Sequence, residues 1–269
     1  MHLDLDHPVL VFACDIDGCL AAVGHAAFDL QTLHAVAELN RASEDDPTIP
    51  ALTLLTGRPH PYVDAMTQVL DLRLPVSFEN GAGLATRHPY EAWLVPEAQT
   101  SLEALRRCER LLEERDDVFI QFGKVASLSV FPTEDGPGVE ELTEQLRALL
   151  SEHDLELIAE PSASDCVNVL LPGVDKVRGL SALIEPLDLP EAAVAGMGDA
   201  VGDVEWLRRC GVSFAPAGAG PEVQGAVTRV SRLDDAAAVL EAYEALVAAN
   251  RSLARGRWTD TAGRPGSAG

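Results

Sequence analysis

The chain has 269 residues, a length that suits two domains or one domain with a large insertion. Apolar residues make up 47%, enough for a sizeable core, and the formal net charge is −23 at pH 7. Such an acidic surface repels phosphate backbones and anionic lipids, so we expect no nucleic-acid partner and no membrane partner. The five cysteines are scattered without a CxxC pair, which argues against a zinc site or a disulfide framework. We therefore expect a cytoplasmic protein, and the sequence indicates no oligomeric state.

The N-terminal part alternates predicted strands with predicted helices. Val9–Cys14 lacks polar alternation, which is typical of a buried strand in a parallel sheet. A helix, a strand, a helix and a strand are expected next, at Phe28–Leu39, Ala51–Leu55, His60–Leu70 and Val76–Phe78. This order predicts a parallel sheet with helices packed on it.

The middle of the chain has a different order of elements. A loop or hairpin is expected over Gly83–Trp93. After it the pattern predicts a helix, two strands, a helix and two strands, at Gln99–Glu114, Val118–Phe122, Ala126–Phe131, Val139–His153, Leu155–Ala159 and Cys166–Leu170. An αββαββ order is typical of a small α+β domain with an open sheet. We place this inserted domain at residues 84–172.

The parallel pattern resumes near Gly173. Helices are expected at Val177–Ile184, Val201–Cys210 and Ala236–Ala249, and strands at Ala192–Gly196 and Val212–Ala215. Residues 1–83 and 173–250 are therefore predicted to form one discontinuous domain, and residues 251–269 a mobile polar tail. The expected fold class is α/β, with a Rossmann-like parallel-sheet core and an inserted α+β domain.

Two carboxylates follow the first predicted strand, in Asp15-Ile16-Asp17-Gly18. A turn explains the Asp-Gly pair, but it does not explain Asp15 directly after a buried strand. Two carboxylates this close repel each other unless a cation lies between them or one holds a proton. The ligand crevice of an open α/β sheet lies at the carboxyl ends of its strands. We therefore expect Asp15 to be a nucleophile or a metal ligand and Asp17 a proton donor.

Thr56-Gly57-Arg58 follows the second predicted strand and precedes Pro59. On its own this stretch favours a helix N-cap, since threonine caps helices well and proline suits the first turn. The alternative is a phosphate site, because a hydroxyl and free backbone N–H groups at a helix N-terminus also suit an anion.

Only two of the 20 basic residues are lysines, Lys124 and Lys176, and the other 18 are arginines. Retained lysines in such a chain indicate places where a compact ammonium is needed. For Lys176, just before a predicted helix, a solvated surface position is the alternative. For Lys124 a surface position on a hairpin is favoured, with a substrate contact as the alternative.

A third strand end carries Gly198-Asp199-Ala200-Val201-Gly202-Asp203. Helix capping by Asp199, with Asp203 in the first turn, is the structural interpretation, but capping explains only one of the two acids. Hard oxygen ligands without histidine or cysteine favour Mg²⁺ over zinc. Mg²⁺, a lysine, a hydroxyl and backbone N–H groups together suit the binding of a phosphoryl group.

In sequence order, these four motifs resemble those of the haloacid dehalogenase superfamily. The resemblance is to the Cof-like and sugar-phosphatase subgroup, which has a large cap inserted between the second and third motifs. DIDG matches the family's DxDG, LLTGR its second motif, Lys176 its third-motif lysine and GDAVGD its GDxxND. The stretch ENGA at Glu79–Ala82 is similar to one common in this subgroup. The match spans about Val9 to Ala215, and the cap would occupy residues 84–172.

The resemblance implies a catalytic role for the first motif and a phosphate site from the next two. Asp15 would attack phosphorus and carry an aspartyl-phosphate. Asp17 would protonate the leaving alcohol and then activate water. Thr56, the Gly57 N–H and Lys176 would hold the transferring phosphoryl group.

The resemblance also implies a Mg²⁺ site. Its ligands would be the Asp15 carboxylate, the Asp17 carbonyl and Asp199, with Asp203 in or near the coordination shell. Three further residues are candidates for supporting the site or facing the substrate: Arg58, Asn80 and Gly202. The chain departs from the family pattern where Gly202 replaces the usual Asn, Ala200 a frequent Ser and Cys19 a frequent Thr.

The expected function is that of a Mg²⁺-dependent phosphomonoester phosphatase acting on a small phosphorylated metabolite, with a sugar phosphate favoured. One alternative is a phosphomutase with the same nucleophile. Another is a non-catalytic protein that binds phosphorylated metabolites on a degraded site. Gly202 favours that last alternative, and the intact acidic residues and Lys176 oppose it. The residues do not specify the substrate.

Overall fold

A five-stranded sheet forms the centre of the molecule in the computed structural model, which describes residues 1–23, 26–162 and 165–262. Its order is β12-β11-β10-β1-β2, and all neighbouring strands are parallel. The strands are β1 (Val11–Cys14), β2 (Ala51–Leu54), β10 (Val194–Met197), β11 (Val212–Ala215) and β12 (Arg229–Val230). Strands from the two ends of the chain are thus neighbours, and the predicted α/β class is confirmed.

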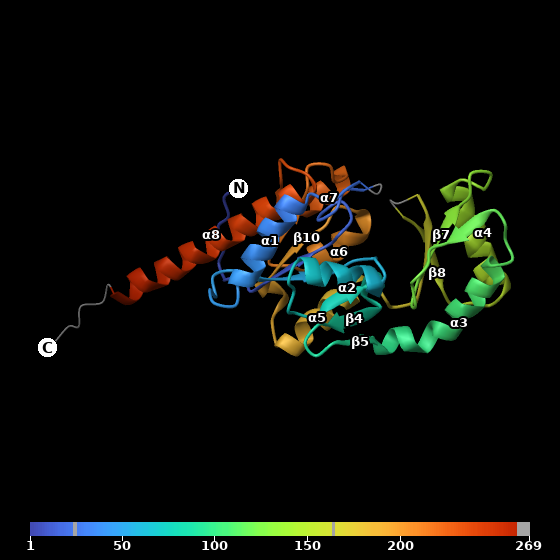
Figure 1. Ribbon diagram of the computed structural model, residues 1–269, viewed down its shortest axis with the longest axis horizontal. Coiled ribbons are helices and arrows are strands. Elements are labelled where there is room, and N and C mark those ends of the chain that lie inside the picture. Colours follow the sequence, from blue (N-terminus) through green and yellow to red (C-terminus); the bar gives the residue numbers. More distant parts are fainter. Residues whose placement is uncertain (24–25, 163–164, 263–269) are drawn as a thin grey trace.

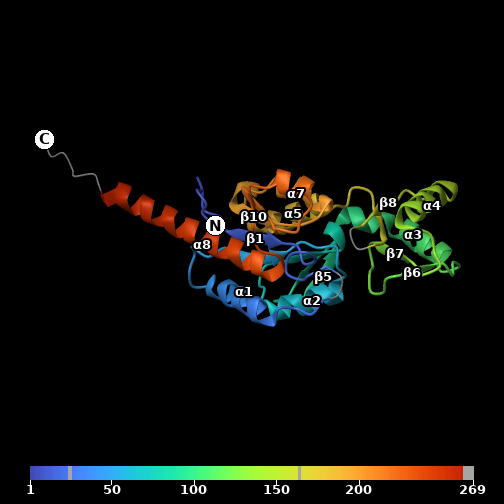
Figure 2. The ribbon, with the colours of Figure 1, turned by 90° about the horizontal axis from the view of Figure 1, so that it is seen from above.

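Helices cover both faces of this sheet, because successive residues of a strand point to opposite faces. Val11 and Ala13 of β1 belong to one buried cluster, and Phe12 and Cys14 belong to the other. Figure 2 shows α5 and α7 above the sheet and α1 below it. The helices of this part are α1 (Leu30–Ala42), α2 (His60–Val69), α5 (Lys176–Ile184), α6 (Val204–Leu207), α7 (Pro221–Ala226) and α8 (Asp235–Ala262). None of the helices in the described ranges is both long enough and apolar enough to cross a membrane.

A three-stranded antiparallel sheet continues from β2. It consists of β3 (Val76–Phe78), β4 (Gly83–Thr86) and β5 (Glu91–Leu94), so the segment predicted as loop or hairpin is a hairpin. A parallel bridge between Leu55 and Ser77 joins it to the end of β2. The short 3-10 helix η1 (Glu79–Gly81) connects β3 to β4.

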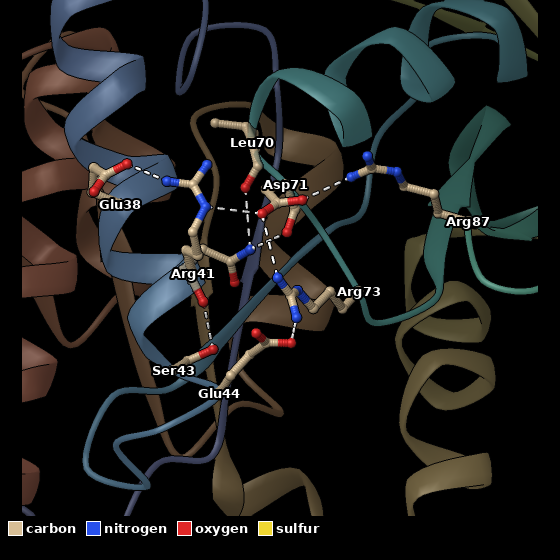
Figure 3. Close-up of polar contacts among 9 residues, drawn as sticks. Glu38, Arg41, Ser43, Glu44, Leu70, Asp71, Arg73 and Arg87 are labelled. Carbon is tan, nitrogen blue, oxygen red and sulfur yellow. Dashed lines mark hydrogen bonds and ion pairs between the residues drawn. The ribbon is translucent and has the colours of Figure 1, made fainter.

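Asp71 ties the hairpin to the parallel-sheet part through arginines from three segments (Figure 3). Its carboxylate accepts from Arg41 of α1 at 3.1 Å and from Arg87 of the β4–β5 turn at 2.8 Å, and Arg73 lies 3.4 Å away. Burial alone would raise the pKa of Asp71, but Arg41 and Arg87 outweigh it and lower the pKa. These pairs are partly exposed, so they orient the segments more than they stabilise them.

A separate antiparallel sheet, with order β6-β7-β9-β8, lies beyond the hairpin (Figure 1). Its elements are α3 (Pro96–Leu112), β6 (Val118–Ile120), β7 (Leu128–Pro132), α4 (Val139–Glu152), β8 (Ile158–Pro161) and β9 (Val167–Leu170). Their order is the predicted αββαββ. We propose that this unit is the cap expected at residues 84–172 and that residues 1–83 and 173–250 form the core.

One helix prediction in the C-terminal part is wrong, and several short elements there were not predicted. The helix expected at Val201–Cys210 is interrupted, because a 3-10 turn, η4 (Val201–Asp203), precedes the short α6. The structure also contains α7 and β12, which the sequence pattern did not indicate because both are very short. Two further 3-10 turns, η2 (Glu185–Leu187) and η3 (Glu191–Ala193), lie between α5 and β10.

The predicted end of the last helix, at Ala249, is wrong. Helix α8 does not end near Ala249 but continues to Ala262, and residues 263–269 lie outside the described part. Asn250, at the expected end of the helix, is only 3% exposed. Its side chain donates to the Val9 oxygen at 2.7 Å and to the Thr48 oxygen at 3.1 Å, and it accepts from the Val9 N–H at 3.0 Å. This polar residue therefore anchors the helix to the sheet.

Asn250→Ala is expected to lower the free energy of unfolding by about 2–3 kcal/mol, because a buried N–H and two carbonyls lose their partner. Urea denaturation of the variant and wild type measures this difference. Ser252→Ala, an exposed change two residues along the same helix, serves as the control and should leave stability unchanged. Equal stability of Asn250→Ala and the control would show that α8 does not depend on this anchor.

Candidate active site

The predicted strand ends meet at one edge of the parallel sheet. Cys14 of β1 is in register with Met197 of β10 and Leu54 of β2, so the residues after these strands lie side by side. The Asp15 N–H continues this pairing by donating to the Met197 oxygen at 2.9 Å. The edge therefore carries the DIDG, TGR and GDAVGD segments together, as the sequence predicted.

Lys176 lies at the centre of the acidic groups. It is the first residue of α5, whose N-cap is Asp175. Its Nζ donates to Asp15 Oδ2 at 2.6 Å and to Asp203 Oδ1 at 2.5 Å, and the side chain is buried. Burial alone would lower the pKa of Lys176, but the two carboxylates outweigh it and raise the pKa. Lys176 is thus a charged, buried lysine and not a solvated surface residue.

Asp15 is held on both of its carboxylate oxygens. Oδ1 accepts from the Ile16 N–H at 2.7 Å and Oδ2 from Lys176, and only 5% of the residue is exposed. Burial raises the pKa of Asp15 to about 6, with the Asp203 charge adding to the rise and Lys176 opposing it. The carboxylate is therefore fixed in direction, and ionisation in this crowded site needs compensating positive charge.

Asp199 completes an acidic cluster. Ligand atoms of Asp15, Asp199 and Asp203 all lie within 4.8 Å of one another. Burial, followed by the charges of Asp15 and Asp203, raises the pKa of Asp199 to about 7. Gly18, at φ +69°, allows its close approach, because a Cβ there would lie 2.1 Å from Asp199 Oδ2. Three carboxylates around one lysine, with no soft donor among them, fit a hard divalent cation.

Asp203 has a structural role that the sequence interpretation missed. Oδ1 accepts from Lys176 and, at 2.9 Å, from the Trp206 indole N–H, while Oδ2 accepts from the N–H groups of Asp199 at 3.1 Å and Ala200 at 3.0 Å. Asp203 thus accepts the backbone N–H groups of this turn, so the expectation that Asp199 caps it is wrong. Four donors occupy both oxygens of this completely buried carboxylate. Asp203 positions Lys176 and the Asp199 loop, and direct metal contact would displace one of these hydrogen bonds.

Asp17 faces a different partner from Asp15. Arg58 binds it through two hydrogen bonds, from Nε to Oδ2 at 2.7 Å and from Nη2 to Oδ1 at 2.5 Å. The guanidinium also lies 4.7 Å from the centre of the Tyr62 ring. Two hydrogen bonds between one guanidinium and one carboxylate fix the orientation of both side chains. Arg58, predicted only as a supporting or substrate-facing residue, therefore holds the carboxylate that the sequence assigned to proton transfer.

Thr56 is buried beside this pair, but it does not cap α2. The N-cap is Pro59, without a side-chain hydrogen bond, so the capping interpretation is wrong. The Thr56 hydroxyl instead accepts from the Arg58 N–H at 3.3 Å. Asn80 closes the same turn: its N–H donates to the Thr56 oxygen at 2.9 Å, and a Cβ on Gly57 would lie 2.9 Å from its Oδ1.

Glu79 links the site edge to the antiparallel unit. Its carboxylate accepts from the N–H groups of Val125 at 3.0 Å and Ala126 at 2.8 Å and from the Ser127 hydroxyl at 3.0 Å. Both Glu79 and Asn80 have left-handed backbone conformations, at φ 49° and 56°. The ENGA stretch marked this segment in the sequence, but its partners about 46 residues away could not be read from it.

Gly202, which replaces the family's usual Asn, lies exposed in the turn before Asp203. A Cβ built on it would meet no heavy atom within 4 Å. The structure should therefore accommodate Gly202→Asn. The affinity for Mg²⁺ should stay unchanged or rise, because the added amide provides an oxygen ligand near the acidic cluster. Calorimetric titration of Mg²⁺ into both proteins tests this, with Gly225→Asn on α7, which is equally unobstructed, as the control. Weaker Mg²⁺ binding by Gly202→Asn alone would show that the glycine is required.

Part of this site lies in a stretch that resembles a known family. Residues 124–242, which include Lys176, Asp199 and Asp203, match the model for haloacid dehalogenase-like hydrolase. Over this stretch the chain is similar to haloacid dehalogenase-like hydrolases. This match supports the hydrolytic enzyme class that the motifs predicted.

Two curated relatives of this chain carry the same name. A phosphoglycolate phosphatase of Nitrosopumilus maritimus is 22% identical over 235 residues, covering 87% of this chain and 95% of the relative. A phosphoglycolate phosphatase of Natronomonas pharaonis is 25% identical over 237 residues, covering 88% and 97%. Both alignments span nearly the whole of each relative.

Solved structures share the fold of this hydrolase. A Thermoplasma acidophilum protein superposes with a TM-score of 0.70 at 16% identity, covering 89% of this chain and 99% of its own. The sucrose-phosphatase of Synechocystis sp. PCC6803, solved with sucrose and phosphate, superposes with a TM-score of 0.64 at 16% identity, covering 89% and 98%. These similarities extend through both the parallel sheet and the antiparallel unit.

Proposed function

We propose that this hydrolase is a Mg²⁺-dependent phosphomonoester phosphatase that acts through an aspartyl-phosphate on Asp15. The observation that carries the proposal is the position of the Asp15 carboxylate at the end of β1, fixed by Lys176 and next to Asp199. The two curated relatives named as phosphatases support the reaction class. The free state of all five cysteines fits a reducing cytoplasm, where we place the protein.

In the first step a carboxylate oxygen of Asp15 attacks phosphorus, and the bond from phosphorus to the ester oxygen breaks. Lys176 neutralises part of the charge on Asp15 and on the incoming phosphoryl group. The Thr56 hydroxyl and the Gly57 N–H would bind the phosphoryl oxygens. The Asp15 and Asp199 carboxylates and the Asp17 carbonyl would hold Mg²⁺, which supplies charge neutralisation to the phosphoryl group when bound.

Asp17 would move the protons in both steps. It gives a proton to the leaving alcohol, and in the second step it takes one from the water that attacks the aspartyl-phosphate. Inorganic phosphate leaves, and the Asp15 carboxylate is restored. Each oxygen of Asp17 accepts one hydrogen bond from Arg58 in this structure, which leaves each oxygen a second lone pair toward the leaving group.

The substrate would be a small phosphorylated metabolite. Phosphoglycolate is favoured by the names of the two relatives, which align over most of this chain. A sugar phosphate, the class expected from the sequence, is the second candidate, since the similar sucrose-phosphatase structure contains sucrose and phosphate.

Phosphate release from 2-phosphoglycolate, sucrose phosphate and p-nitrophenyl phosphate, measured with Mg²⁺ and again with excess EDTA, tests this function. We expect release with Mg²⁺ and its loss in EDTA. Full activity in EDTA would refute the metal assignment. Formation of an isomeric sugar phosphate without phosphate release would indicate a phosphomutase, and binding without turnover a non-catalytic protein.

A further inference from the structure

Lys124 is the second lysine of the chain, and it does not extend freely from the surface. It lies in the loop between β6 and β7, and its Nζ donates to Ser129 Oγ at 2.7 Å. Ser129 in turn donates to Asn168 Oδ1 at 2.7 Å, its cross-strand partner on β9. Lys124 thus lies in a hairpin loop, half-buried, with its ammonium directed back to the four-stranded sheet.

The face of the four-stranded sheet that carries Ser129 and Asn168 is turned toward the parallel-sheet part. Leu128 and Val130, the neighbours of Ser129 in β7, belong to the buried cluster that also contains Leu142 and Leu146 of α4. Because strand side chains alternate between faces, Ser129 points away from α4. Figure 1 shows α4 on the side of this sheet that is remote from the parallel sheet.

The loop that carries Lys124 is tethered to the edge of the active site. Val125, the next residue, donates its N–H to Glu79, and the Glu79 N–H donates to the Arg58 oxygen at 3.1 Å. On the other side of Lys124, a Cβ placed on Gly123 would lie 4.0 Å from Pro59 Cβ. The loop of Lys124 thus lies next to the TGR segment, whose Arg58 binds Asp17.

The charge of Lys124 has no close protein partner. Among the residues described, no carboxylate lies within 4.0 Å of its Nζ, and Ser129 satisfies only one of the three ammonium protons. Burial lowers the pKa of Lys124, against the opposing effect of Glu79, and the charges of Arg58 and Asp17 also act on it. A partly buried ammonium without a counter-ion costs stability, which binding an anion would offset.

We propose that Lys124 binds a second anionic group of the substrate, a carboxylate on the alcohol side of the phosphoester, and so determines specificity. This assignment rests on the proposed phosphatase function. With phosphorus at Asp15 and the ester oxygen toward Asp17, the leaving alcohol extends past the Arg58 pair toward the loop of residues 121–127. The proximity of this loop to Pro59 and Glu79 favours short acids over long chains.

The test compares 2-phosphoglycolate with 2-hydroxyethyl phosphate, in which a neutral hydroxymethyl group replaces the carboxylate. Wild type should prefer 2-phosphoglycolate. In Lys124→Met the ratio of the two kcat/KM values should fall by roughly 10- to 100-fold, the loss expected for one charge-assisted hydrogen bond. Lys124→Gln, whose amide can keep a hydrogen bond to Ser129, should show the same fall if the charge is what matters. Arg110→Met, which removes an exposed charge of α3 paired with Glu103, is the control and should leave the ratio unchanged.

An equal loss on both substrates, an unchanged ratio, or no wild-type preference for 2-phosphoglycolate would each overturn the assignment of Lys124. These outcomes leave the phosphatase proposal standing, because phosphate is still released. If wild type released phosphate from neither compound nor from p-nitrophenyl phosphate, the proposed function itself would fail, and the Lys124 assignment would fail with it.

Discussion

Asp15→Asn is expected to lower kcat by roughly 10⁴-fold or more, because loss of a covalent nucleophile removes the chemical route. An amide oxygen is a poor nucleophile and brings no charge to the metal cluster. The fold should remain, since asparagine has the same size and can still accept from the Ile16 N–H. The loss should therefore appear in turnover and not in folding.

Stability measurements separate these two effects. Burial and Asp203 raise the pKa of Asp15 to about 6, so above that pH the ionised carboxylate opposes folding in the absence of metal. At pH 8 in EDTA, Asp15→Asn should consequently be at least as stable as wild type. Asp45→Asn, an exposed acid, is the matched control and should keep full activity. Near-normal kcat in Asp15→Asn would rule out the aspartyl-phosphate route.

Lys176→Arg is expected to be nearly as damaging as Lys176→Ala, with a loss of about 10²-fold in kcat/KM. The ammonium reaches Asp15 and Asp203 at 2.6 Å and 2.5 Å from a single buried point. Arginine keeps the charge, but its planar fork is wider and prefers two acceptors lying side by side. It should therefore move the Asp15 carboxylate out of line with phosphorus.

The two variants should differ in stability even though both lose activity. Lys176→Ala leaves two buried carboxylates without their cation, at a cost of about 3–5 kcal/mol in the absence of metal, whereas Lys176→Arg keeps a cation near them. Steady-state kinetics and urea denaturation in EDTA measure both effects. Arg178→Lys, two residues along α5 in an exposed pair with Glu97, is the control. If Lys176→Arg retained most of the wild-type kcat/KM, Lys176 would supply only general positive charge.

The convergence of the candidate catalytic residues was predictable because it follows from local order. Asp15, Thr56 and Asp199 come directly after buried strands, and parallel strands bring their carboxyl ends to one edge. The scarcity of lysine then singled out Lys176. These inferences need only the chain order and the handedness of the sheet, which the sequence pattern determines.

The pairings within the site were not predictable from the same pattern. Arg58 reaches Asp17 across 41 positions, and Trp206 joins Asp203 through side-chain packing. The i, i+3 spacing of Asp203 and Trp206 was the one available signal. Such contacts depend on rotamers and on how neighbouring segments pack, which periodicity does not report.

Long-range placement explains the other differences. Lys124 was assigned to a surface hairpin because its own segment is a short turn, and the hydrogen bond from Val125 to Glu79 that holds this loop beside the site could not be read from that segment. The end of α8 was placed too early because the segment after Ala249 is polar. Asn250 forms hydrogen bonds with the buried N–H and carbonyl groups of Val9, just before β1. The helix therefore continues through this polar residue instead of ending at it.

Detection of a phosphoryl group on Asp15 during turnover tests the central proposal most directly. Wild-type protein mixed with p-nitrophenyl phosphate and Mg²⁺ is quenched in acid at short times, and its peptides are analysed by mass spectrometry. We expect a phosphoryl group on the peptide that contains Asp15, formed and lost fast enough to account for turnover and absent in EDTA. Turnover without this modified peptide, or with the phosphoryl group on another residue, would contradict the proposed mechanism.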